Sequence, residues 1–156
     1  MNEGVASLLA DAMLGRLAKW LRLIGYDTLY GAALSDHQIV SRARAEGRTV
    51  LTRDRGLAQR RGIQCLVIHS DALEDQITEV VAALGLPAAG VESRCPRCNA
   101  VLEEVSHDQA RPHVPAHVLE THRHFRRCPN CARYYWRGSH WERIQQMIDR
   151  YIPNRS

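Results

Sequence analysis

The sequence contains no apolar run that approaches the ~20 residues of a membrane-spanning helix. Its N-terminus has no basic segment followed by a long apolar stretch and a small-residue cleavage site, so we expect no signal peptide and a cytoplasmic location. No GxGxxG follows the first expected strand, and neither GxxxxGK[ST] nor GxSxG occurs. We therefore expect no membrane-spanning helix. The sequence also lacks the motifs that indicate a dinucleotide-binding site, a P-loop or a serine hydrolase.

Charge is distributed unevenly along the 156 residues, whose net charge is +4. Residues 1–93 contain 10 Lys and Arg against 11 Asp and Glu, whereas residues 94–156 contain 11 against 6 and also hold six of the eight His. This asymmetry predicts two units, of which the second attracts a polyanion. A soluble protein that merely has a high pI is the simpler alternative.

The first 92 residues alternate between short apolar runs and amphipathic stretches. Such alternation predicts an α/β fold with a parallel sheet and helices on both faces. Ser35 and Gln38, three residues apart, form the pattern of a helix capping box, and glycines follow the expected helices. The expected strands cover residues 5–10, 27–30, 49–52 and 63–68, and the expected helices cover residues 12–24, 36–46 and 73–84.

Carboxylates follow the expected strands. Asp11 and Asp54 end strands, Asp71 follows one within three residues, and Asp36 opens the helix after the second. Because the carboxyl ends of parallel strands share one edge, we expect these four residues to form a catalytic site there. Clustered carboxylates repel one another, and Mg²⁺ or Mn²⁺ resolves that repulsion. The alternative is structural, since an aspartate also caps a helix or complements its dipole.

Basic residues accompany the carboxylates. Arg16, Lys19 and Arg22 share one side of the first helix, and Arg53 and Arg55 flank Asp54. We expect Arg16 and Lys19 on the helix, and Arg53 and Arg55 beside Asp54, to bind substrate phosphates. A solvated helix face explains the basic stripe on the helix equally well. Trp20 and Leu23 project from the same side, which indicates that part of this side is covered or forms an interface.

Four of the five cysteines form two CxxC pairs, Cys95/Cys98 and Cys128/Cys131, whereas Cys65 is expected to be a core thiol. Each CxxC turn directs two thiolates at one ion, so two turns predict a structural Cys₄ zinc site. Disulfides and redox CxxC motifs are the alternatives, and a second copy argues against a redox role.

The segment between the cysteine pairs is expected to form strands over residues 101–105 and 121–126, joined by a loop that contains His107, His113 and His117. We interpret these histidines as surface or substrate-contact residues. Aromatic residues interleave with arginines over residues 133–141, a pattern that suits single-stranded nucleic acid but also a packed ribbon core. We therefore take Arg137 and His140 as candidate RNA contacts, and we expect a short helix over residues 142–151.

Three stretches carry a resemblance to one family. These are residues 11–27 (DAMLGRLAKWLRLIGYD), residues 51–55 (LTRDR), and the two CxxC pairs followed by residues 135–140 (YWRGSH). Together they resemble the Mut7-C RNase domain, which is similar to PIN-domain ribonucleases with an appended zinc ribbon. The resemblance implies a PIN-like three-layer domain over residues 1–92, a zinc ribbon over residues 93–156, and an acidic Mg²⁺ or Mn²⁺ site that cleaves single-stranded RNA. It places Asp11 and Asp54 in that site.

The sequence thus predicts a metal-dependent endoribonuclease in which Asp11 and Asp54 bind Mg²⁺ or Mn²⁺, with Asp36 and Asp71 as additional acids. Two alternatives stay open. One is an RNA-binding or ribosome-associated zinc-ribbon module whose aspartates only cap helices. The other is a toxin-like ribonuclease controlled by a partner protein, for which Trp20 and Leu23 suit an interface.

Overall fold

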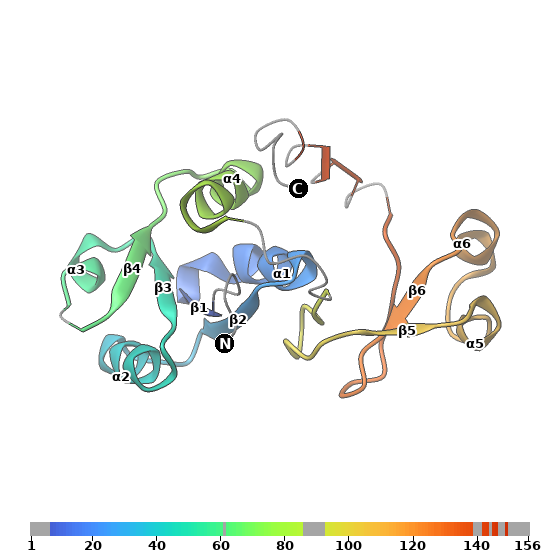
Figure 1. Cartoon of the computed structure of the whole chain (residues 1–156), viewed down its shortest axis with the longest axis horizontal. Helices are drawn as coiled ribbons and strands as arrows, with labels where there is room; N and C mark the ends of the chain where they lie inside the picture. The colour runs from blue at the N-terminus through green and yellow to red at the C-terminus, as the bar shows by residue number, and fades with distance from the viewer. Residues whose placement is uncertain are drawn as a thin grey trace. The chain divides into compact units, whose positions relative to one another are not determined.

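The computed structural model describes residues 7–60, 62–85, 93–138, 142–143, 145–146 and 149, and the chain divides into two compact units, residues 1–99 and 100–156. Figure 1 labels the helices and strands of both units. No helix within the described part is long and apolar enough to cross a bilayer. The boundary expected between residues 92 and 93 stays a prediction, and so does the C-terminal helix over residues 142–151, half of which lies outside the described residues.

A four-stranded parallel sheet forms the centre of the first unit. It consists of β1 (Ser7–Asp11), β2 (Asp27–Gly31), β3 (Thr49–Thr52) and β4 (Gln64–Val67) in the order β2-β1-β3-β4. All four strands agree with the runs expected from the sequence to within a few residues. Since every pair is parallel, the residues that follow the strands emerge at one edge, as predicted.

Helices cover both faces of this sheet, which confirms the predicted α/β class. On one face, Leu9 and Val50 pack with Ile39 of α2 (Asp36–Glu46) and Leu57 of α3 (Arg55–Ala58). Side chains alternate along a strand, so the buried Leu8 belongs to the opposite face. There α1 (Gly15–Ile24) contacts α4 (Leu73–Leu84), as the ribbon of Figure 1 also shows.

The helix boundaries follow the local chemistry of the sequence. The hydroxyl of Ser35 accepts the backbone N–H of Gln38, and the Gln38 side chain accepts the N–H of Ser35, so the capping box is confirmed. Gly47 ends α2 with φ of 66°, a left-handed conformation that suits glycine. One boundary differs from the prediction, because residues Ala12–Leu14 form a 3₁₀ turn, η1, before α1 begins.

The second unit contains an antiparallel sheet with the order β5-β6-β7, made of β5 (Glu103–Val105), β6 (Phe125–Arg127) and β7 (Tyr134–Tyr135). The prediction of a loop between the first two of these strands is wrong. It contains α5 (His107–Ala110) and α6 (Ala116–Thr121), which pack a small core against Phe125. These helices are too short for a helical period to stand out in the sequence.

Candidate active site and metal centre

Asp11 ends β1 at the edge where the strands of the first sheet finish. Its side chain is largely buried, with 9 % of the residue surface exposed. One carboxylate oxygen accepts the N–H of Met13 at 3.1 Å and so caps η1, and the other accepts the hydroxyl of Thr52. A carboxylate accepts about four hydrogen bonds, so Asp11 retains capacity for a further ligand.

Thr52 connects Asp11 to the second predicted acid. This residue is fully buried at the end of β3, and its oxygen accepts the backbone N–H of Asp54 at 3.0 Å while its hydroxyl donates to Asp11. Thr52 is not among the site residues predicted from the sequence. The available signal was a hydroxyl residue that ends a strand two positions before a candidate catalytic aspartate.

Asp54 is exposed and caps α3, since its carboxylate accepts the N–H of Gly56 at 2.8 Å. The capping role that was considered for this residue is therefore present in the structure. The second carboxylate oxygen of Asp54 is not used by this hydrogen bond, so the capping contact leaves the residue able to bind a cation. The arrangement brings Asp54 and Asp11 to the same hydroxyl.

Asp71 does not cap α4, although its sequence position suggested this. The N-cap of α4 is Ala72, which makes no side-chain cap bond. Asp71 instead pairs with Arg53 at 2.7 Å, and the Arg53 guanidinium also donates to the carbonyl of Ser70. The predicted phosphate-binding Arg53 therefore joins the loop after β3 to the loop after β4.

Glu79 of α4 supports the loop that carries Asp71, and sequence reasoning missed it. Its carboxylate accepts the backbone N–H groups of His69 at 3.0 Å and Ser70 at 2.8 Å. Burial by itself raises the pKa of Glu79, but these hydrogen bonds outweigh burial and hold the pKa below its usual value. Glu79 therefore stays ionised and fixes the backbone after β4.

The four candidate acids do not close into one compact ligand group. Asp36 is exposed in the first turn of α2, where it complements the helix dipole. Among the described residues, no three carboxylates place their oxygens within 4.8 Å of one another, whereas the four cysteine sulfurs do. The structure thus brings Asp11 and Asp54 to one hydroxyl and leaves Asp36 and Asp71 apart from it.

The cysteine cluster has the donor set of a zinc site. Cys95 and Cys128 are buried and Cys98 and Cys131 are half-buried, with all four sulfurs within 4.8 Å of one another. A tetrahedral Zn²⁺ with Zn–S of about 2.3 Å places its sulfurs about 3.8 Å apart, which this spacing accommodates. The four thiols therefore fit a metal ion such as zinc, as predicted.

Comparison with family models matches residues 6–148 to the Mut7-C RNAse domain. The chain belongs to the Mut7-C RNase domain family. No curated protein and no solved structure matches it. Membership in this family indicates a nuclease-type function with RNA as the substrate, and the match confirms the resemblance carried by residues 11–27, 51–55 and the CxxC pairs.

The predicted phosphate-binding residues of this Mut7-C RNase domain lie in different environments. Arg16 and Lys19 are exposed on α1, which begins four residues after Asp11, and Arg55 is exposed at the start of α3. His140 lies outside the described residues. Trp20 and Leu23 are half-buried on α1.

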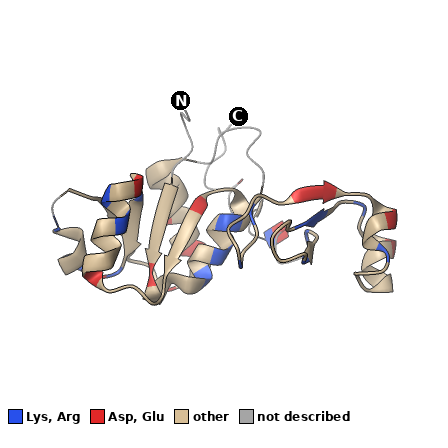
Figure 2. Ribbon diagram, turned by 90° about the horizontal axis from the view of Figure 1, so that it is seen from below, with Lys and Arg blue, Asp and Glu red and all other residues tan. Residues whose placement is uncertain are grey.

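Charges in the second unit are partly compensated. Figure 2 shows a red strand beside a blue one, where β5 supplies glutamates and β6 supplies arginines. Glu103 pairs with Arg127 at 3.1 Å and Glu104 with Arg126 at 3.8 Å. Desolvation, and then the like charge of Arg126, lowers the pKa of Arg137, so these two cations lie close enough to repel. A phosphate group relieves such repulsion.

The histidines between the cysteine pairs are more structural than predicted. His107 forms a hydrogen bond with the carbonyl of Leu119 at 2.7 Å and contacts the ring of Phe125 edge-on. His113 is stacked on Tyr134 with ring centroids 4.6 Å apart. His107 is half-buried and ties α5 to α6, while a substrate contact by these histidines stays a prediction.

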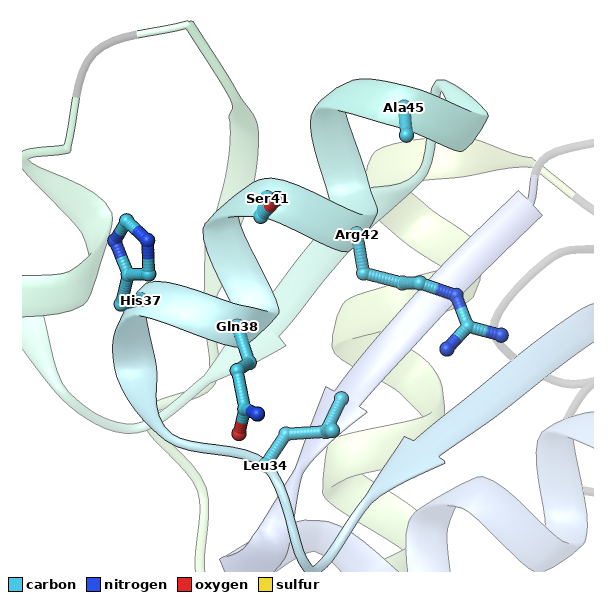
Figure 3. Close-up of a pocket in the computed structure, with 6 residues that line it drawn as sticks. All are labelled: Leu34, His37, Gln38, Ser41, Arg42 and Ala45. Atoms are coloured by element: carbon cyan, nitrogen blue, oxygen red, sulfur yellow. The ribbon is translucent and has the colours of Figure 1, made fainter.

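A shallow hollow of about 320 Å³ lies on the outer face of α2 (Figure 3). None of the predicted site residues lines it. Its walls come from α2 and the turn before it. The lining residues are Leu34, His37, Gln38, Ser41, Arg42 and Ala45.

Proposed function

We propose that this chain is a metal-dependent endoribonuclease that cleaves single-stranded RNA at the edge of the sheet where Asp11 and Asp54 lie. The observation that carries the proposal is the shared contact of these two residues with the buried hydroxyl of Thr52. The hydroxyl donates to the Asp11 carboxylate and accepts the backbone N–H of Asp54, which fixes the position of the two residues relative to each other. Family membership supports the nuclease class.

The free acceptor capacity of Asp11 and Asp54 suits a hard divalent cation that keeps several water ligands. When bound, Mg²⁺ or Mn²⁺ supplies Lewis-acid activation of water and stabilises the leaving oxygen. The protein's own contribution is to hold the carboxylate of Asp11 and the backbone of Asp54 through the buried hydroxyl of Thr52. No protein nucleophile is needed in this scheme.

Substrate phosphates are proposed to contact exposed cations on both sides of the acidic pair. Arg16 and Lys19 lie on the exposed face of α1, and Arg55 lies at the start of α3. Arg53 is proposed to contact substrate while it remains paired with Asp71, because its guanidinium has donors beyond the two bonds it makes. In the second unit, Arg137 and His140 are the proposed RNA contacts. Asp36 and Asp71 are proposed as auxiliary acids of the same edge.

The test is cleavage of a 5′-labelled single-stranded RNA and of a matched hairpin, with Mn²⁺, with Mg²⁺ and with EDTA. Asp11→Asn and Asp54→Asn keep a side-chain oxygen that can accept the capping N–H, so folding is preserved while anionic charge is lost. We expect each variant to lose at least about 100-fold in kcat, as for removal of a key electrostatic group. Asp75→Asn, an exposed aspartate of α4, is the matched control and retains activity.

A second candidate function is an RNA-binding module without catalysis. The observation that favours it is that three of the aspartates have structural contacts: Asp11 and Asp54 cap turns, and Asp71 pairs with Arg53. Such a module binds RNA in a salt-dependent way and shows no metal-dependent cleavage. Unchanged cleavage in both asparagine variants contradicts the proposed site, and absence of cleavage in the unsubstituted protein favours the binding module.

A further inference from the structure

The loop of the first cysteine pair lies on the end of α1 and on β2, all within the first unit. The backbone N–H of Arg94 donates to the carbonyl of Arg22 at 2.8 Å, and Arg22 donates to the carbonyl of Pro96 at 2.6 Å. Two oppositely directed hydrogen bonds therefore join the last turn of α1 to the residues on either side of Cys95. A cysteine turn that depended only on its metal would show no such contacts.

Arg22 is buried, with 8 % of its surface exposed, although the sequence placed it in a basic stripe. Its Nε donates to the carbonyl of Thr28 on β2 at 2.7 Å, so one guanidinium joins β2 to the cysteine loop. Burial lowers the pKa of Arg22, and the charges of Cys95 and Cys98 oppose that effect. A Zn²⁺ ion with four thiolates has a net charge of −2, so a cation held beside it is favourable in a low dielectric.

Asn99 makes the second connection. It follows Cys98 with φ of 64°, and its N–H donates to the carbonyl of Cys95 at 2.8 Å, which closes the turn. Its side-chain oxygen accepts the N–H of Thr28 at 3.1 Å, and its side-chain nitrogen donates to Asp27 at 2.7 Å. Since β2 is an edge strand, Asn99 satisfies an edge N–H that no neighbouring strand can reach.

The second cysteine pair supplies an internal comparison. Ala132 follows Cys131 with the same φ of 64°, and its N–H donates to the carbonyl of Cys128 at 2.9 Å. The backbone of the two turns is therefore alike. Alanine has no side chain able to make the bonds that Asn99 makes, so the choice of asparagine at position 99 reflects more than the turn itself.

We propose that Arg22 and Asn99 are positioning residues for the metal ligands of the first unit, holding Cys95 and Cys98 on α1 and β2 before the metal binds. The affinity of the cysteine cluster for metal then depends on both residues. By linkage, metal binding stabilises the last turn of α1 and the edge strand β2. This proposal does not depend on whether the chain cleaves RNA.

The test measures zinc affinity of the full chain by competition with a chromophoric chelator. Arg22→Met removes the charge and both donors, whereas Asn99→Gly keeps the left-handed turn and removes only the side-chain bonds. We expect each to weaken zinc binding about 10-fold or more, as for other partners that orient metal ligands. Arg97→Gln removes an exposed charge from the same loop, and Ala132→Gly makes the matching change in the second turn. Both controls are expected to bind within twofold of the unsubstituted chain.

Hydrogen exchange gives an independent measurement. Removal of zinc with the chelator should accelerate exchange in peptides that cover residues 20–30 more than in peptides that cover β4, at the far edge of the sheet. If Arg22→Met fails to fold, Asn99→Gly decides the affinity question alone. The proposal is overturned if Asn99→Gly binds zinc within twofold of the unsubstituted chain, if the controls lose as much affinity, or if zinc removal leaves residues 20–30 unchanged.

Discussion

Thr52→Val is the most informative perturbation of the candidate active site. Valine has nearly the same shape as threonine, so the fully buried position stays filled while the hydroxyl is lost. Two hydrogen bonds disappear at once: the one donated to the Asp11 carboxylate and the one accepted from the Asp54 N–H at 3.0 Å. The change therefore tests whether the two acids need their common partner.

The expected cost follows from the surroundings of the two bonds. A hydrogen bond to a charged group contributes about 1.5–3 kcal/mol, and an unsatisfied partner group costs about 1–3 kcal/mol. Asp54 is exposed, so water compensates part of the loss at its N–H, whereas Asp11 is 9 % exposed and receives little compensation. We therefore expect the free energy of unfolding to fall by about 2–3 kcal/mol.

The assay combines urea unfolding with cleavage of single-stranded RNA. For Thr52→Val we expect kcat to fall about 10- to 100-fold with little change in KM, because the acids are displaced while the substrate cations are untouched. Thr52→Ser keeps the hydroxyl and should recover most of kcat. Thr49→Val is the matched control on the same strand as Thr52, since the hydroxyl of Thr49 makes an exposed hydrogen bond of 3.3 Å to Gln64 of the neighbouring strand β4.

The reasoning is refuted by either of two results. One is a Thr52→Val protein with unchanged kcat, which means that the hydroxyl does not orient the acids. The other is a loss of kcat that Thr52→Ser does not recover, which assigns the effect to packing instead of hydrogen bonding. An equal loss of kcat in Thr49→Val would likewise show that the effect is not specific to the hydroxyl that contacts Asp11.

Three further predictions concern other parts of the chain. Burial disfavours the charged form of Asp27, yet Asn99 and Arg48 outweigh it and hold its pKa below the usual value. Its stabilisation is therefore present above the unfolded pKa of about 3.9 and lost as pH falls through the folded pKa, so Asp27→Asn should flatten the acid limb of stability measured by urea unfolding. Phe125→Ala should destabilise the second unit by about 3–5 kcal/mol in thermal unfolding, because this side chain is 2 % exposed in its core. Lys19 is the single lysine of the chain, so RNA should slow its modification by an amine-reactive reagent, and equal rates with and without RNA contradict a contact there.

Much of the first unit was predictable because its signals are local. Each apolar run of four to six residues between turn signals corresponds to a strand, and the capping box at Ser35 and Gln38 marks the start of α2 correctly. The CxxC pairs predicted a four-cysteine cluster because each short spacing brings two thiols together and a tetrahedral Zn²⁺ site takes four ligands. The catalytic role of the aspartates stays a prediction.

Contacts between residues far apart in the chain could not be predicted from the sequence. Arg22 lies on the basic side of an amphipathic helix, yet it is buried because the cysteine loop folds over the last turn of α1. Asp71 has the spacing of a helix cap, yet its carboxylate pairs with Arg53, which follows β3. In both cases the partner lies at least 18 residues away, and no local pattern indicates it.

The sequence alone therefore determined the order of strands and helices, the edge at which carboxylates emerge, and the set of four thiols, because periodicity, capping and short spacings act within a few residues. Only the tertiary structure decided which polar groups meet. It joined Asp11 to Asp54 through Thr52, and Arg22 to the loop of Cys95, since those contacts exist only once strands and loops distant in the chain pack side by side.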